Sequence, residues 1–458
     1  MQDFRVFLLF LDKLMIVMRN LTAHLLALGL LTLPITSFAQ EEPEKKNTFN
    51  LDLQFVTQGE IRDGGLVSDN TDNPEQHDHT NFVVSRVRMN LGYQHRDLEL
   101  KVIPQYTYIW GQQGYGSFRL YEAYAKYTAP FGLIAQLGRQ ALSYDDERII
   151  GPNDWAMGSV SHDVLKLGYE GHGHKVHALL GYNQNPENID LGGTDYYNGA
   201  QPYKIMHTLW YHYDVPGINL GASVLFMNLG VQSAEELQEK RTIYQQMVGT
   251  HLSFTPKWGD FSACYYRQLG RNENNIPLAG WMAAFKGHAQ PTGFLGITAG
   301  YDYLSGDPYF VVPDGQAIGL IRHDVMRGFS SLYGSHHKFY GIMDFFYVST
   351  YYHGFSPGLQ NAFAGVDASF LNHTLSFSGT YHYLATSTKL KDLGMTLGHC
   401  VELSAAWQPL KYISLSLGYS FMSGTETMKR LKRASSDGRL NWAWLTVVIS
   451  PGIFNKKW

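Results

Sequence analysis

The chain has 458 residues, of which 14% are aromatic and only 17% are charged, with 30 tyrosines and 46 glycines. This tyrosine-rich and charge-poor composition favours strands over helices. The formal net charge of −4 leaves no basic excess, so nucleic acid is excluded as a partner. Cys264 and Cys400 have no Cys or His neighbour at zinc spacing, and we expect two unpaired buried thiols.

Residues 1–39 are predicted to form an N-terminal extension and a secretory signal peptide. Arg19 precedes a leucine-rich run, and Ala39 ends a small-residue cleavage pattern. Charged residues interrupt the first seventeen positions, so the simplest interpretation makes Met18 the true start. A retained membrane helix is the alternative, which the shortness of the apolar run disfavours. Residues 40–458 then form a single predicted domain that is mildly acidic.

The rest of the chain alternates apolar and polar residues with a period of two. Ile413, Leu415 and Leu417 alternate with Ser414 and Ser416, so one face is apolar and the other is nearly all serine. The polar face of a soluble sandwich would carry more Lys and Glu, whereas small neutral residues suit a lumen. In chain order the pattern predicts strands near residues 48–60, 81–94, 97–110, 117–128, 131–142, 161–170, 174–183, 203–214, 217–228, 242–255, 258–270, 280–289, 293–304, 360–371, 373–386, 398–408, 411–423 and 439–450.

Short turns such as 94–97 alternate with longer polar stretches such as 62–80. An outer-membrane barrel has this rhythm, because its short turns face the periplasm and its long loops face outward. Residues 338–346 also resemble a strand, but a nineteenth strand would break the even count. We therefore assign them to a long external loop, 305–358, that folds inward. The predicted fold is all-β: a single transmembrane antiparallel β-barrel of eighteen strands in the outer membrane of a Gram-negative bacterium, surrounded by lipid and lipopolysaccharide.

The stretch from Leu137 to Trp155 resembles the alginate-export family of outer-membrane porins. Asp145 departs from that pattern, because the family has glycine there, and this change is expected to alter the local turn. Residues 337–344 and the last strand are similar to further elements of these proteins. The resemblance implies an eighteen-stranded barrel with an arginine-rich path for an anionic polysaccharide. The matching positions are Gly138, Arg139, Gln140, Tyr144, Asp146, Glu147, Arg148, Gly151, Asp154, Trp155 and Asp163.

Arginine suits such a path because its guanidinium stays charged and forks onto carboxylates. Arg86 and Arg88 share their parity with Asn90, so both are expected to face the lumen. For Arg119 and Arg139 the parity is ambiguous, and the resemblance implies the pore position. The alternative is that each cation pairs with a carboxylate and only packs a wide lumen. The predicted pore-lining residues are Arg86, Arg88, Arg119, Arg139, Arg267 and Lys286.

Mixed charges in the signature are expected at an extracellular strand end. There they would fix a loop over the pore, although a plain solvated loop is an equal alternative. The predicted mouth or gate network consists of Asp146, Glu147, Arg148, Asp154 and Asp163.

These observations predict a passive channel for an alginate-like anionic polysaccharide or for smaller anionic solutes, with direction and periplasmic partner left open. One alternative is an outer-membrane lipid hydrolase that uses Ser378 or Ser356 with His382. Another is a plugged structural or adhesive barrel. No catalytic residue, metal site or cofactor is predicted. The histidines at 172, 174 and 177 suit a solvated turn better than a metal site, and the acidic first loop is a weak calcium candidate through Asp69, Asn70, Asp72 and Glu75.

Overall fold

The computed structural model describes residues 47–64, 79–112, 114, 116–185, 197, 202–234, 241–307, 324–344, 346, 356–390, 392–432 and 438–458. The predicted signal peptide and the acidic first loop lie outside these residues. The described strands belong to one compact unit, Lys46–Trp458. Within the described residues, no helix has the length and apolarity needed to span a bilayer.

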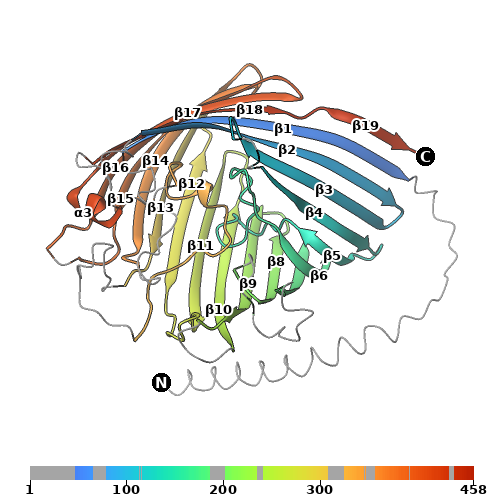
Figure 1. Cartoon of the computed structure of the whole chain (residues 1–458), viewed down its shortest axis with the longest axis horizontal. Coiled ribbons are helices and arrows are strands. Elements are labelled where there is room, and N and C mark those ends of the chain that lie inside the picture. The colour runs from blue at the N-terminus through green and yellow to red at the C-terminus, as the bar shows by residue number, and fades with distance from the viewer. Residues whose placement is uncertain are drawn as a thin grey trace. The chain divides into compact units, whose positions relative to one another are not determined.

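Antiparallel strands make up nearly all of this unit, and consecutive strands lie side by side (Figure 1). In the described parts of the connections lie two short helical segments, η3 (His336–Lys338) and α3 (Glu426–Lys432). The strands are β1 (Thr48–Asp63), β2 (His79–His95), β3 (Leu98–Ile109), β4 (Ser117–Thr128), β5 (Leu133–Gln140), β6 (His162–Gly171), β7 (His174–Tyr182), β8 (Ile205–Val215), β9 (Leu220–Gln232), β10 (Thr242–Phe254), β11 (Gly259–Gly270), β12 (Trp281–Ala289), β13 (Leu295–Leu304), β14 (Leu359–Phe370), β15 (Leu375–Ala385), β16 (Thr396–Leu410), β17 (Ile413–Gly424), β18 (Arg439–Ile449) and β19 (Gly452–Lys457).

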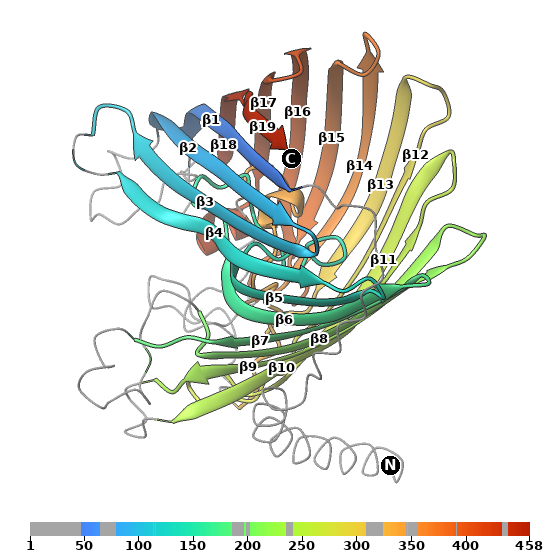
Figure 2. The ribbon, with the colours of Figure 1, turned by 90° about the vertical axis from the view of Figure 1, so that its right-hand side faces the viewer.

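The sheet closes on itself because β1 pairs with both β2 and β18. Figure 2 shows the two ends of the chain's strand series meeting, with β1 beside β18 and β19. Closure leaves no open edge, which is the condition for a sheet that spans a bilayer. The predicted eighteen-stranded barrel is confirmed, and the predicted strands all occur.

The one additional strand is β19, which the sequence pattern did not predict. It continues the direction of β18 after Pro451 and pairs with the start of β1, from Thr48 opposite Lys457 to Asp52 opposite Gly452. The pairing of β1 with β19 shifts register between Leu51 and Asp52, and pairing with β18 begins at Phe55, opposite Ile449. Proline lacks the N–H that a ladder needs, and it therefore separates β18 from β19.

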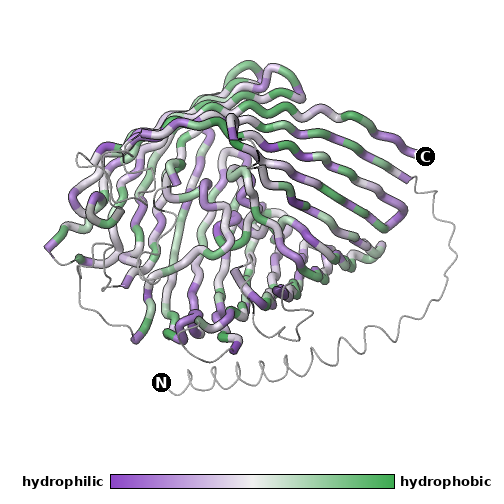
Figure 3. Tube along the Cα trace, in the orientation of Figure 1, coloured by the Kyte–Doolittle hydropathy of each residue, from purple (hydrophilic) through white to green (hydrophobic). Residues whose placement is uncertain are grey.

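Alternation along each strand gives the wall two different faces (Figure 3). On β17, Leu417 is 54% exposed on the outside, whereas Ser420 is fully buried on the inside. On β15, Phe377 is 47% exposed, and its neighbour Ser378 donates to or accepts from Ser404 across the inner face. An apolar outer face and a polar inner face are typical of an outer-membrane barrel.

Short and long connections alternate along the chain, as predicted. The short ones range from the two residues between His95 and Leu98 to the five between Ala289 and Leu295. The other side of the barrel carries the long ones, including 141–161 after β5 and 305–358 after β13. In the described part of the strand-like stretch, Lys338 ends η3 and residues 339–344 form bends and a turn, not a strand. The prediction of a long loop here is therefore consistent with the described residues.

Candidate functional site in the barrel lumen

Two connections, 141–161 and 324–344, fold into the barrel and bind each other; we call them the inner loops. Ile150 forms a parallel bridge with Tyr333, and the Gly151 N–H donates to the Tyr333 carbonyl at 2.9 Å. The Ser335 N–H donates to the Glu147 carbonyl at 2.9 Å. Trp155 of the first loop also packs on the inward-facing Trp444 of β18 at 4.9 Å between ring centroids. The pair of loops therefore narrows the lumen.

Arg86 and Arg88 lie on the inner face of β2, as predicted, and both bind the first inner loop. Arg88 forms an ion pair with Asp154 at 2.7 Å, and Arg86 contacts the same carboxylate at 3.3 Å. Both guanidinium groups also donate to the Ser159 hydroxyl, at 3.0 and 2.7 Å. Arg88 further lies 3.8 Å from the centre of the Tyr121 ring. These two cations thus anchor a loop, and the single carboxylate of Asp154 balances one of their two positive charges.

Arg119 lies on the inner face of β4, where the parity was ambiguous. The ladder between β3 and β4 shifts register at Ile103, so Tyr121 and Glu122 both turn inward as in a β-bulge. Arg119 donates to the Ser159 carbonyl at 2.9 Å, and its Nε has no partner. Among the described residues it forms no ion pair. It lines a cavity of about 660 Å³ beside the inner loops.

Arg139 is placed differently from the prediction. Arg139 lies two residues after the exposed Leu137 and therefore shares the outward face of β5. Its register partners on the neighbouring strands are Ala123 and Asp163. Asp163 binds both arms of the guanidinium, at 2.8 and 2.7 Å. Arg139 therefore reaches the edge of the same cavity from the outward face of β5, as half of an ion pair.

Arg267 does not line the lumen, and this part of the prediction is wrong. On β11 the buried residues are Cys264, Tyr266 and Gln268, whereas Tyr265 and Arg267 are exposed on the opposite face. Lys286 does face inward as predicted, because it alternates with the exposed Phe285 on β12. It lines a second cavity of about 570 Å³.

The predicted mouth residues divide into separate networks. Asp154 binds β2 and Asp163 binds Arg139, as described above. Glu147 accepts from Lys338 of the second inner loop at 2.5 Å and from Ser143 at 2.8 Å. Burial opposes ionisation of Glu147, but the hydrogen bonds from Lys338 and Ser143 outweigh it and lower the pKa of this carboxyl group. This loop-to-loop ion pair is thus formed at neutral pH.

Arg148 is the centre of a buried network that the sequence did not predict in full. It is 5% exposed and forms ion pairs with Asp146 at 3.1 Å and with Asp302 of β13 at 2.9 Å. Its guanidinium also packs 4.0 Å from the centre of the Phe339 ring. The other Asp302 oxygen accepts from the Asn361 amide at 2.9 Å. A buried charge needs such partners, since an unpaired one is costly.

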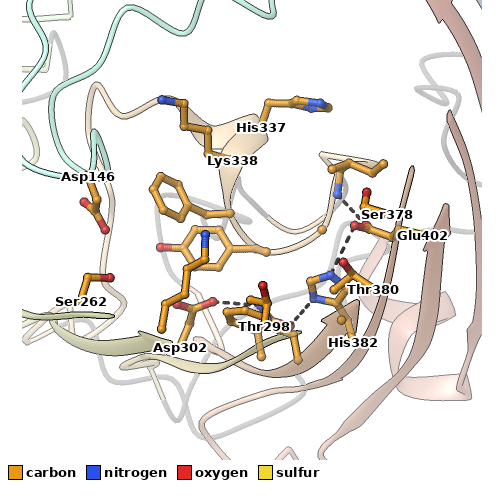
Figure 4. A pocket seen from close by; sticks show the side chains of 18 of the residues that line it. Asp146, Ser262, Thr298, Asp302, His337, Lys338, Ser378, Thr380, His382 and Glu402 are labelled. Atoms are coloured by element: carbon orange, nitrogen blue, oxygen red, sulfur yellow. Dashed lines mark hydrogen bonds and ion pairs between the residues drawn. The ribbon is translucent and has the colours of Figure 1, made fainter. Parts of the chain in front are cut away.

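The same network continues to the second inner loop through β15 and β16 (Figure 4). His382 Nδ1 lies 2.9 Å from the side-chain oxygen Oδ1 of Asn361, and its Nε2 lies 3.3 Å from Glu402. Glu402 in turn accepts from the Ile342 N–H at 2.6 Å. A continuous chain of polar contacts therefore joins both inner loops to the wall.

Asp145 adopts a backbone conformation that is unusual for a residue other than glycine. Its φ of 54° lies in the left-handed region that glycine favours. Its carboxylate accepts from Trp210 at 2.9 Å and from Tyr266 at 3.2 Å, both on the inner wall. These contacts hold a conformation that an L residue adopts at a cost.

The candidate hydrolase residues do not assemble into a catalytic site. His382 is bound by Asn361 and Glu402, while Ser378 pairs with Ser404 at 2.7 Å. The Ser356 hydroxyl, 1% exposed, accepts from the Gly358 N–H at 3.0 Å. A nucleophile needs a base within hydrogen-bond reach, and among the described residues no histidine forms a hydrogen bond with either serine hydroxyl.

Two inward lysines were missed by the sequence analysis. Register places Lys126 of β4 opposite Gln136 of β5, and Gln136 opposite Lys166 of β6. Neither ammonium group forms an ion pair with any described residue. Lys126 precedes the exposed Tyr127, and Lys166 precedes the exposed Leu167. Because neighbouring residues of a strand point to opposite faces, this alternation would have placed both lysines inside.

A closed eighteen-stranded barrel with a polar inner face and two inner loops has the fold of outer-membrane porins. Solved structures similar to this chain include three Pseudomonas aeruginosa proteins of this class, OccK11 (OpdR), OccK5 (OpdH) and OpdO. Their TM-scores are 0.58, 0.59 and 0.58, and their sequence identities are 12%, 12% and 13%. The match covers 89% of this chain in each case and 96%, 98% and 98% of the other chain.

No family model and no curated protein matches the sequence. The alginate-export resemblance therefore gains no support, and the likeness to the Pseudomonas structures establishes the fold alone.

Proposed function

We propose that this protein is an outer-membrane channel through which small anionic solutes diffuse passively. The fold supports a channel, because the wall is closed and its inner face is polar. The placement of unpaired cations on the inner wall supports an anionic solute.

The cations without carboxylate partners carry the proposal. Arg119, Lys126 and Lys166 lie on the inner faces of β4 and β6 and form no ion pair among the described residues. A solute with a carboxylate or phosphate group supplies the missing counter-charge at each of them. Arginine and lysine rings select anions in other pores on the same physical ground. Arg86 and Arg88 contribute less, because they share the carboxylate of Asp154, which neutralises one of their two positive charges.

The inner loops favour a small solute over a polymer. They bind each other at Gly151 and Tyr333, and they bind the wall at β2 and β18 through Asp154 and Trp155 and at β13 through Arg148. A polysaccharide of many units would need a continuous wide path, which these contacts narrow. An extended anionic polysaccharide is therefore a less favoured substrate than a small anionic solute.

Bilayer recordings with the purified full-length chain test this proposal. We expect stepwise conductance with a preference for chloride over potassium, and Arg119→Gln should reduce that preference. Arg267→Gln is the matched control, because Arg267 faces outward. Cation preference, or selectivity unaffected by Arg119→Gln, would contradict the anionic substrate. An absence of steps would favour the plugged barrel instead.

A further inference from the structure

Arg267 places a positive charge on the outward face of the wall, where a barrel meets lipid. It lies on β11, close to the end of that strand at Gly270, and it is exposed like Tyr265 on the same face. The connection 271–280 belongs to the longer set, so Arg267 lies at the outer end of the barrel. A cation on the lipid-facing surface is costly at the bilayer midplane and nearly free of cost at the interface. The position of Arg267 therefore indicates the interface of the outer leaflet.

Aromatic rings mark the same interface beside Arg267. Its register partner on β12 is Trp281. The Trp281 ring lies 6.1 Å from the ring of Tyr265 and 4.8 Å from that of Tyr303, measured between centroids. Tyrosine and tryptophan collect where the hydrocarbon core of a bilayer meets the headgroups. The guanidinium group of Arg267 is thus placed among the outer-leaflet headgroups.

Two amide side chains extend this polar surface over the neighbouring strands. Gln246 of β10 and Asn228 of β9 are register partners, and the Gln246 Nε2 donates to the Asn228 Oδ1 at 2.7 Å. Both share the parity of exposed residues, Val248 and Val224. Arg267 pairs with Val248, so it is a diagonal neighbour of Gln246 on the outward face. A cation and two amides therefore lie together on β9, β10 and β11, which are adjacent strands (Figure 1).

The charge on this part of the wall is one-sided. The acidic residues of β8 to β12 are Asp214 and Asp260, and both lie at the short-turn end. Arg267 forms no ion pair with a residue that the structure describes. In the connection 271–280, Arg271 and Glu273 contribute one charge of each sign. The outward face thus carries a positive charge without a counter-charge at its outer end.

We propose that this surface, which we call the outer patch, binds the phosphorylated sugar headgroup of lipopolysaccharide. The guanidinium fork of Arg267 binds phosphate oxygens, the amides of Gln246 and Asn228 bind sugar hydroxyl groups, and the acyl chains lie on the apolar wall below. A phosphate ion lacks the acyl chains and a glycerophospholipid lacks the sugars, so neither matches the whole patch. The outer patch lies on the opposite face of the wall from the lumen. Lipid binding there goes beyond the proposed channel and does not depend on its solute.

Native mass spectrometry of the purified full-length chain in detergent tests the proposal. Diphosphoryl lipid A should bind more tightly than phosphatidylglycerol. Arg267→Gln should weaken lipid A binding by about tenfold, the effect of one charge-assisted hydrogen bond. Arg267→Lys should keep part of the affinity, because it keeps the charge and loses the fork. Lys257→Gln, at the short-turn end of the same β10–β11 hairpin, is the matched control and should bind lipid A as the parent does.

Three results would overturn the outer patch as a lipopolysaccharide site. Lipid A binding that is equal in Arg267→Gln and the parent would remove the site. Phosphatidylglycerol binding as tight as that of lipid A would assign the patch to any anionic lipid. Displacement of lipid A by inorganic phosphate at equal concentration would assign it to a phosphate ion. Current steps in bilayers without lipopolysaccharide test the channel separately, so either result can fail while the other stands. Heat-modifiable mobility on a gel verifies that each variant is folded.

Discussion

At the scale of single residues, the lumen contains two kinds of cation. Arg86, Arg88 and Arg148 each contact one or more carboxylates and hold the inner loops in place. Arg119 and Lys286 form no ion pair within the described residues. The first kind serves structure and the second is available to a solute. Substitutions should therefore separate stability from selectivity.

Asp302→Ala tests the structural kind. Arg148, 5% exposed, would lose its closer carboxylate and keep Asp146 alone. Breaking a buried ion pair costs on the order of 3 kcal/mol, and the free energy of unfolding in detergent should fall by about that amount. Asp260→Ala, at a carboxylate that is 58% exposed, is the control and should change stability little. An Asp302→Ala protein as stable as its parent would contradict the buried network.

Glu147 gives the lumen a pH dependence with a definite sign. Its pKa is lowered below the ordinary 4.5 by Lys338 and Ser143, which overcome the effect of burial. The ion pair is therefore complete above pH 4.5 and is lost as the pH falls through the lower folded-state pKa. We expect the open-channel current to become noisier below that pH as the inner loops separate. Glu147→Gln should show such noise already at pH 7, and a Glu147→Gln current as quiet as that of the parent would argue against the contact.

At the scale of elements, the strands could be predicted and their long-range partners could not. Alternation is a local property, and it located all eighteen strands of the barrel. Pro451 interrupts the alternation, so β19 was not predicted. The bulge in β4 interrupts the alternation there, so the face of Arg119 could not be assigned from sequence. Arg267 was misplaced although Cys264 and Tyr266 define the inner face of β11. Asp302 is 154 residues from Arg148 in sequence, so only the folded barrel reveals their pairing.

The contact between the inner loops and β18 can be tested at Trp155. Its ring stacks on His337 at 3.9 Å with an interplanar angle of 1°, and its edge contacts Trp444. Each aromatic contact contributes roughly 0.5–1.5 kcal/mol, so Trp155→Ala should release the loops and raise the single-channel conductance. Trp258→Ala, in a short turn, should leave the conductance unchanged. Unchanged conductance in Trp155→Ala would mean that these loops do not limit the flow.

At the scale of the whole molecule, the barrel map places the two cysteines far apart. Cys264 on β11 and Cys400 on β16 are both free and buried. The intact mass should therefore correspond to two thiols, and a maleimide should label them only after unfolding. A disulfide between them would contradict the order of the strands around the wall.

The whole barrel also explains why net charge says little about the solute. The chain carries 36 basic and 40 acidic residues, yet many of these groups pair with each other or lie outside the lumen. What a solute meets is the local field of the inner wall. Arg119, Lys126 and Lys166 make that field positive on β4 and β6, whereas β15 and β17 present mainly hydroxyl groups.

The reversal potential across a planar bilayer under a potassium chloride gradient tests this account most directly. A channel lined by unpaired cations should give a potential of the sign that chloride permeation produces. Neutralising Arg119, Lys126 and Lys166 together should move that potential toward zero. A parent potential of the opposite sign, or one that the triple substitution leaves unchanged, would contradict the assignment of these residues to the solute path.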